Sequence, residues 1–184
     1  MTRFRLSLIG LLAAIALLAP ATHAVARPGA CASAHAQISR ATLQQARDAT
    51  LCLLNRARGR AGLPPLRLDP KLSHAAGHHS RDMVRRRYFA HDSPGGRSPF
   101  ARMRATHYVP RNASWWLGEN IGWGSGPLEA PASVVRMWMH SPSHRANILS
   151  RHFRDIGIGI AAGAPVAAAG DGGATYTTDF GRHS

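Results

Sequence analysis

The chain has 184 residues, 45% of them hydrophobic, which is enough for one domain with a buried core and excludes wholesale disorder. It carries 23 basic and 9 acidic residues, and the net charge of +14 is compatible with an anionic cell-envelope polymer as a partner. Because the charge is spread along the chain, a compositional bias toward arginine explains it better, and we expect no nucleic-acid partner.

Residues 1–26 have the pattern of a secretory signal peptide. Arg3 and Arg5 precede the apolar run 6–18, and Ala24-Val25-Ala26 forms a cleavage site of the A-x-A type. The run is shorter than the roughly 20 apolar residues that a transmembrane helix needs, although an uncleaved anchor is the alternative. The sequence therefore predicts a secreted protein, extracellular or in the cell envelope, with no transmembrane span after cleavage.

The chain has two cysteines, Cys31 and Cys52. An even number of cysteines in a secreted protein predicts one disulfide. It would tether an N-terminal arm, residues 27–40, to the first long helix of a domain that spans residues 41–184. Closing a loop of about 20 residues is worth about 3 kcal/mol in the chain-entropy account.

Three helices are expected in the first half of the chain. Residues 38–61 have apolar positions at a mixed spacing of three and four, and Gly62 ends this helix. Asp69 and Pro70 are typical of a helix N-terminus, and the second helix should run to about Arg87. Residues 98–103 form a short third helix that begins at Ser98.

The second half mixes irregular chain, a helix and two strands. Residues 107–128 are rich in Trp and Gly and are expected to be irregular, whereas residues 130–140 form a helix that Ser141 and Pro142 break. Residues 156–161 and 174–180 are expected to be strands, and the Ala/Gly-rich segment 162–173 suits a hairpin connection between them.

The signatures of most common enzyme classes are absent. The sequence has no His-Glu-x-x-His zinc-protease helix, no G-x-S-x-G elbow, no P-loop and no dinucleotide-binding glycine pattern. His74 and His78 are four residues apart on a predicted helix and could bind a metal together. No acidic residue or cysteine nearby completes that set, so two histidines on a solvated helix face are the favoured interpretation.

Several motifs occur in the order that one family shows. They are Tyr88-Phe89-Ala90-His91, Gly118-Glu119-Asn120-Ile121, the segment 138–149 and the C-terminal segments 155–159 and 176–181. Here the chain resembles the CAP superfamily of cysteine-rich secretory, antigen 5 and pathogenesis-related proteins, in its bacterial SCP-like branch, over about residues 43–181. The resemblance implies an α+β fold, a three-layer α-β-α sandwich with a small, mostly antiparallel sheet.

The resemblance also implies a cleft lined by histidines and carboxylates. His91, Glu119 and His144 match three members of the family's tetrad, whereas the second Glu of eukaryotic members falls at Ser141. This departure counts against a mechanism that needs two carboxylates. Asn120 is expected to be structural, because its amide can bond to backbone beside the cleft.

The chemistry of these side chains allows more than one function. In the family a divalent metal is seen at the paired histidines, so His91 and His144 are the expected ligands of an optional Zn²⁺ or another divalent metal, and Glu119 either ligates it or orients a ligand. The favoured function is a module whose cleft binds a small ligand, lipid or peptide. The alternative is a metal-assisted hydrolase of peptide or cell wall, with Glu119 as catalytic general base. A purely structural hydrogen bond between His91 and Glu119 also stays open.

Overall fold

The computed structural model describes residues 30–39, 42–166 and 172–184. The predicted signal peptide, residues 1–26, lies outside the described residues. The helices are α1 (Leu43–Arg60), α2 (Pro70–Arg86), α3 (Pro99–Ala105), the 3-10 helix η2 (Gly126–Glu129), α4 (Pro131–His140) and α5 (Pro142–Ile148). The strands are β1 (Arg67–Leu68), β2 (Trp115–Gly124), β3 (Asp155–Ala162) and β4 (Ala174–His183).

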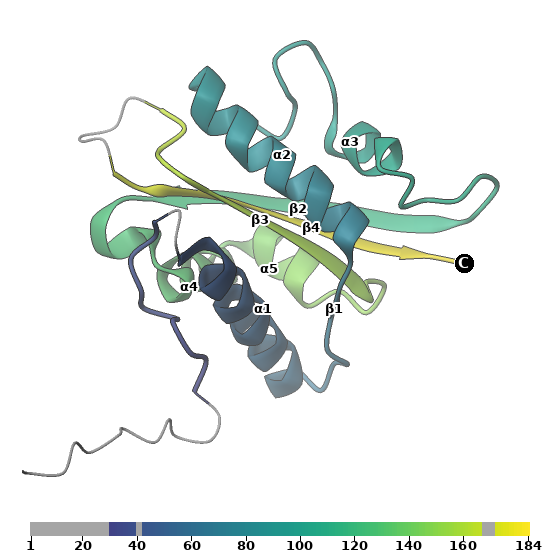
Figure 1. Ribbon diagram of the computed structural model, residues 1–184. Coiled ribbons are helices and arrows are strands. Elements are labelled where there is room, and N and C mark those ends of the chain that lie inside the picture. Colours follow the sequence, from purple (N-terminus) through teal and green to yellow (C-terminus); the bar gives the residue numbers. More distant parts are fainter. Residues whose placement is uncertain (1–29, 40–41, 167–171) are drawn as a thin grey trace, which may run out of the picture.

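A single sheet of these strands lies between two helical layers (Figure 1). Helices α2 and α3 cover one face, and α1, α4 and α5 cover the other. The strand order is β1-β3-β4-β2, with a short parallel pair between β1 and β3 and antiparallel pairs elsewhere. The predicted three-layer α-β-α sandwich with a mostly antiparallel sheet is therefore confirmed, and β2 is an edge strand.

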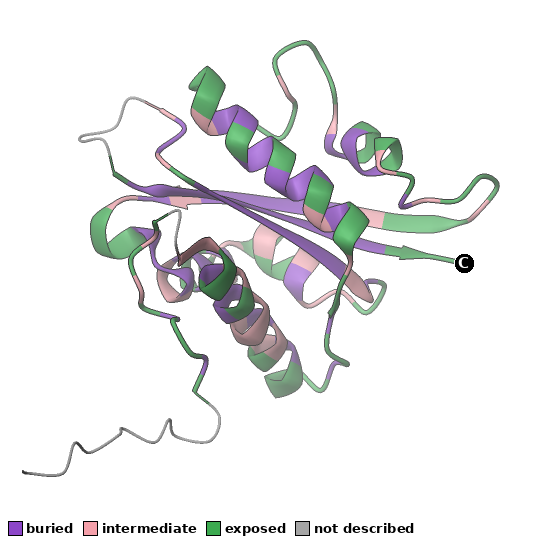
Figure 2. Ribbon diagram, in the orientation of Figure 1, coloured by how far each residue is buried: buried purple, intermediate pink, exposed green. Residues whose placement is uncertain are grey.

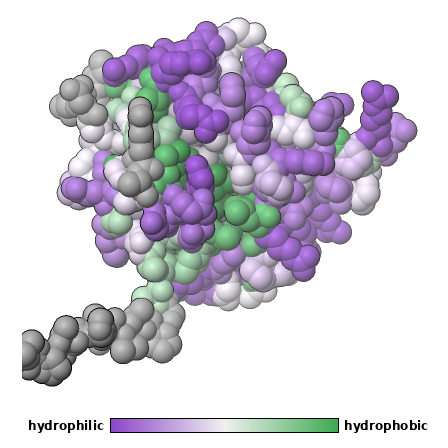
Figure 3. All heavy atoms as spheres, in the orientation of Figure 1, coloured by the Kyte–Doolittle hydropathy of each residue, from purple (hydrophilic) through white to green (hydrophobic). Residues whose placement is uncertain are grey.

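Buried residues follow the strands and the helix faces turned toward them (Figure 2). The larger core joins the sheet to α1, α4 and α5 and contains Trp138, Ile156 and Phe180. A smaller core on the other face contains Leu72 of α2 and Met103 of α3. The surface seen in Figure 3 is mostly hydrophilic, with a hydrophobic band across its middle.

Glycines in β3 bring α2 unusually close to the sheet. A Cβ atom at Gly157 would overlap the backbone of Leu72, and one at Gly159 would overlap the backbone of Ala76. Because neither glycine has a side chain, the helix lies directly on the strand. This close contact places the α2 side chains and the loop that follows α2 next to the strands of the site.

The segment expected to be irregular contains a ten-residue strand, so that prediction was wrong. β2 pairs along its whole length with β4, from Trp115 opposite His183 to Gly124 opposite Ala174. Its glycines hid the strand pattern, but they are required by packing. A Cβ atom at Gly118 would approach Phe153, and one at Gly122 would approach Trp138. β2 therefore has glycine where α4 and the chain after α5 pack closely against it.

Two helix boundaries also differ from the prediction. α1 begins at Leu43 rather than at residue 38. Ser141 and Pro142 do end α4, but Pro142 is also the first residue of a new helix, α5. Proline is favoured at a first helical position, because the N–H it lacks would have no partner inside the helix. Helix α5 was not expected, and it carries His144.

The expected disulfide between Cys31 and Cys52 is present and ties the N-terminal arm to α1. α1 is also bound to the chain after α5 through the buried side chain of Arg58, which donates to the carbonyl oxygens of Ile148 and Ser150 at 2.8 and 2.9 Å. These links hold α1 and α5 together on one face of the sheet.

Candidate functional site

A hydrogen-bonded pair of His91 and Glu119 lies at the edge strand of the sheet. Glu119 is in the middle of β2, where its side chain is only 2% exposed, and His91 comes from the loop after α2, where its side chain is 52% exposed. His91 Nδ1 lies 2.7 Å from Glu119 Oε1. Since an ionised carboxylate can only accept, Nδ1 donates. The second ring nitrogen, Nε2, has no hydrogen-bond partner among the described residues.

The second oxygen of Glu119 is held by an arginine. Arg102 of α3, itself buried, donates from Nη2 to Glu119 Oε2 at 2.6 Å. Burial raises the pKa of Glu119, but the hydrogen bond from His91 and the charge of Arg102 outweigh it, so the pKa lies below its usual value. The carboxylate is therefore ionised at neutral pH, with both oxygens engaged.

The carboxylate in turn changes the titration of His91. The hydrogen bond to Glu119 raises the pKa of His91, and the smaller opposing effects of partial burial and of Arg102 do not cancel it. A ring oriented by a carboxylate through Nδ1 presents a fixed tautomer, with a lone pair on Nε2 when it is neutral. The pair thus gives His91 a defined direction and a stronger affinity for a proton.

A buried histidine on α2 supports the loop that carries His91. His79 Nε2 lies 3.0 Å from the carbonyl oxygen of Ala90, the residue before His91. Burial lowers the pKa of His79 to about 4, against a smaller raising effect of Glu119, so the ring is neutral at physiological pH. A neutral ring that donates through Nε2 satisfies the carbonyl and fixes the backbone next to His91.

His144 approaches from α5, on the other side of β2. Its Nδ1 lies 2.8 Å from Ser141 Oγ, and its ring is half-buried. Asn120 donates to the carbonyl of His144 at 3.0 Å, which is the backbone bond expected of that amide. Asn147 donates to the carbonyl of Glu119 at 3.1 Å and to Asn120 Oδ1 at 2.9 Å. These bonds fasten α5 to the part of β2 that carries Glu119.

The charge of His91 acts on His144. Burial lowers the pKa of His144, and the charge of His91 lowers it further. His91, Glu119, Arg102 and His144 are called the His–Glu cluster below. The sequence motifs picked out three of its members and missed Arg102, as well as His79 and Asn147, which support it. Asn147 lies inside the motif 138–149 but was given no role there, whereas the signal for Arg102 and His79 in the sequence is residue type alone.

A further carboxylate lies beside the cluster. Asp179 of β4 is the register partner of Glu119 and is fully buried. In the sequence it stood out only as part of the C-terminal motif. Ser141 stands where eukaryotic members of the family have their second Glu, and its hydroxyl bonds to His144 instead.

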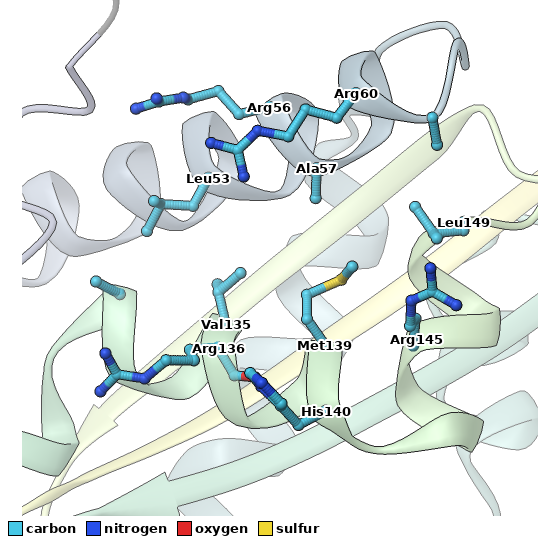
Figure 4. Close-up of a pocket in the computed structure, with 12 residues that line it drawn as sticks. Leu53, Arg56, Ala57, Arg60, Val135, Arg136, Met139, His140, Arg145 and Leu149 are labelled. Atoms are coloured by element: carbon cyan, nitrogen blue, oxygen red, sulfur yellow. The ribbon is translucent and has the colours of Figure 1, made fainter.

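A groove away from the cluster, of about 450 Å³, separates α1 from α4 and α5 (Figure 4). Leu53, Val135 and Met139 give it apolar walls, and Arg60 and Arg136 are among the basic residues that line it. A smaller hollow is lined by the exposed pair His74 and His78, together with Arg97 and Arg102. A cleft at the His–Glu cluster itself stays a prediction.

Comparison with known proteins gives consistent matches. The family model for CAP, described as the cysteine-rich secretory protein family, matches residues 51–169. The uncharacterized protein YkwD of Bacillus subtilis (strain 168) is 41% identical over 107 residues, which make up 58% of this chain and 39% of that protein. The chain thus spans well under half the length of this relative.

Two solved structures have a similar fold. One is an extracellular protein containing an SCP domain from Bacillus anthracis, with a TM-score of 0.55 and 30% identity, over 79% of this chain and 42% of that one. The other is an outer surface protein from Borrelia burgdorferi, with a TM-score of 0.56 and 19% identity, over 71% of this chain and 87% of that one. The second likeness concerns the fold alone.

Proposed function

Because the chain belongs to the CAP family of cysteine-rich secretory proteins, we propose that it is an extracellular or surface binding module that takes its ligand at the His–Glu cluster. The ligand would be a small molecule, lipid or peptide, with a divalent metal as an optional component. The observation that carries this proposal is the arrangement of the two imidazoles. Each of them is held through Nδ1 and has no described partner at Nε2.

A binding role fits the way in which each side chain is held. Glu119 has both oxygens engaged and is sealed from solvent, so it orients His91 rather than meeting a ligand. His91 and His144 are the cluster members with exposed surface, and hydrogen bonds from Asn120 and Asn147 fix the spacing of their supporting elements. A prearranged pair of this kind binds with little loss of side-chain entropy.

Two imidazoles that each have an Nε2 without a described partner offer the donor type that a divalent metal takes from histidine. His91 and His144 would hold it through Nε2, and Glu119 supports His91 as a carboxylate often supports a metal-bound imidazole. Among the described residues no group of three or more His, Cys, Asp or Glu could hold a metal, so water or the ligand would complete the coordination. When bound, a metal such as Zn²⁺ would supply Lewis acidity toward an oxygen of the ligand.

A hydrolase is the second candidate, and one contact favours it. The bond between His91 and Glu119 orients an imidazole as a general base, and the raised pKa of His91 makes its neutral form a stronger proton acceptor. Under this proposal His91, rather than the buried Glu119, accepts the proton. Turnover of a peptide or peptidoglycan substrate that is lost in His91→Gln would support hydrolysis, and no turnover by wild type leaves binding as the function.

The groove between α1 and α4 offers a place for an apolar ligand. Its apolar walls and arginine-rich lining suit a chain with an anionic head (Figure 4). Binding of oleate that Met139→Arg weakens and His91→Ala does not would assign the lipid to this groove. The reverse pattern would assign it to the His–Glu cluster.

One relative and the disulfide support the proposed location outside the cytoplasm. The Bacillus anthracis relative, which is 30% identical, is described as extracellular. The disulfide between Cys31 and Cys52 is typical of an oxidising compartment. No helix in the described part of the chain is long and apolar enough to cross a membrane.

The experiment that tests the proposal is a calorimetric titration of the purified protein with Zn²⁺ near neutral pH. Wild type should bind, and His91→Ala and His144→Ala should each weaken binding by at least about tenfold. His78→Ala, at an exposed histidine outside the cluster, is the matched control and should bind like wild type. Loss of binding in the control alone would move the site to the pair His74 and His78 and contradict the proposal.

A further inference from the structure

The Asp179 carboxyl is buried next to a second carboxyl. Asp179 on β4 and Glu119 on β2 are directly opposite in the antiparallel register. Opposite residues of this kind have Cβ atoms about 4.5–5.5 Å apart and share one face of the sheet. Both residues are buried, and Asp179 is 0% exposed. Two carboxyl groups are therefore enclosed together beneath α2 and α3.

No hydrogen-bond donor among the described residues reaches the Asp179 carboxyl. Neither Asp179 oxygen has a hydrogen-bond partner among the described residues, although both are buried. On β3 its register partner is Gly157, which has no side chain. The charged groups that act on it are Glu119 of β2 and Arg102 of α3. Arg102 donates to Glu119 from Nη2, and its buried Nε makes no hydrogen bond to Asp179 or to any other described residue. From α2, the titratable group near this pair is His79, which is neutral.

A second buried negative charge at this point would be costly. Like charges directly opposite each other on neighbouring strands destabilise a sheet, and a buried ion without a hydrogen bond is strongly disfavoured. The proton that removes this cost also provides the missing hydrogen bond, because a carboxylic acid can donate to a neighbouring carboxylate. Glu119 is the acceptor in place.

We propose that Asp179 is held as a neutral carboxylic acid that donates a hydrogen bond to Glu119 and so positions that carboxylate toward His91 and Arg102. Asp179 is a positioning residue, since it is sealed from solvent and reaches the ligand-facing imidazole only through Glu119. The buried pair carries one negative charge, which Arg102 and His91 share.

The electrostatic balance supports this assignment. Burial, which is the largest effect, and the negative charge of Glu119 raise the pKa of Asp179 well above its usual value, against a smaller lowering effect of Arg102. In the unfolded chain the same group loses its proton near pH 4, at about its ordinary value. Stability that depends on the protonated acid is therefore complete below about pH 4 and is lost as the pH rises toward the folded-state pKa.

The test compares wild type with Asp179→Asn, whose amide can donate to Glu119 but cannot titrate. The folding equilibrium constant of wild type, divided by that of the variant, should fall about tenfold per pH unit from about pH 5 upward, until the folded-state pKa is reached. Urea denaturation at a series of pH values gives this ratio. Asp48→Asn, at an exposed position on α1, is the control, and it shows how far this ratio varies with pH when a solvated carboxylate is replaced. A ratio that does not change with pH would overturn the proposal.

Two further readouts keep the proposal testable if Asp179→Asn folds poorly. The ¹³C chemical shift of the Asp179 carboxyl in wild type should be that of a protonated acid at neutral pH, and an ionised value would overturn the proposal. In a folded variant, the His91 pKa should equal that of wild type; it would fall if an ionised Asp179 had been removed. None of these readouts uses a ligand, so they can fail or succeed independently of the binding proposal.

Discussion

His91 donates from Nδ1 to the buried Oε1 of Glu119 across 2.7 Å, while its own side chain stays half exposed. One end of the ring is thus fixed by a charge inside the protein, and the other end faces the surface. Arg102 holds the same carboxylate from α3, so two cations share one buried anion when His91 is protonated.

Glu119→Gln should lower the pKa of His91, because the variant removes the negative charge that favours the imidazolium ion. It should also cost about 3–5 kcal/mol of stability, since Arg102 is left as a buried charge without its partner. Histidine titration by NMR and urea denaturation measure the two effects. Arg85→Ala, which breaks a pair whose arginine is 75% exposed, is the control and should cost under about 1 kcal/mol. An unchanged pKa would show that the contact is absent in solution.

The buried ring of His79 should make the protein lose stability in acid. Its pKa is lowered to about 4 in the folded state, whereas the unfolded chain binds the proton near its ordinary value. The stabilisation is therefore complete above about pH 6.5 and is lost as the pH falls toward 4, by about 1.4 kcal/mol per pH unit. His79→Gln keeps a donor for the Ala90 carbonyl and should lack this slope in urea denaturation. The same slope in both proteins would contradict the assignment.

Gly159→Ala should be strongly destabilising, by about 1–3 kcal/mol or more, because the new methyl group would meet the α2 backbone at Ala76 rather than a movable side chain. Gly59→Ala is the opposite case. It lies in α1 with nothing near its added methyl group, and it should stabilise the protein by up to about 1 kcal/mol. Thermal denaturation of both variants checks the pair. Equal effects would mean that α2 does not lie directly on β3.

The double variant Cys31→Ser/Cys52→Ser should lose about 3 kcal/mol, since the disulfide closes a loop with a sequence separation of 21 residues. Denaturation of wild type with and without a reducing agent should show the same difference. The histidine spectra should be unchanged in the folded variant, because the disulfide lies on α1 and the His–Glu cluster on the far strand. A change in the His91 resonance would show that the arm affects the site.

The parts of the fold that depend on local signals, such as periodicity and helix caps, could be predicted from the sequence. Asp69 caps α2 through a bond to the Leu72 amide, and Pro70 follows it, as predicted. β2 was missed because its glycines make room for helices that lie elsewhere in the chain. Gly122, for example, packs against Trp138 of α4. α5 was missed because a proline that ends one helix can also begin another.

The candidate site shows the same difference between residues that a local motif identifies and residues that only the folded structure brings together. Motifs identified His91, Glu119 and His144, because those residues recur at a fixed order in the family. Arg102 and Asp179 became visible only when the strand register and the packing of α3 placed them beside Glu119. A contact between side chains 17 residues apart, on two different elements, leaves no pattern in a single sequence.

The most direct test of the binding account is a long-range ¹H–¹⁵N spectrum of the histidine side chains recorded during a Zn²⁺ titration. The account predicts that His91 and His144 move together, that the change is largest at Nε2, and that Nδ1 of His91 keeps its proton toward Glu119. If His74 and His78 responded instead, or if His91 and His144 moved at different metal concentrations, the two imidazoles would not form one site.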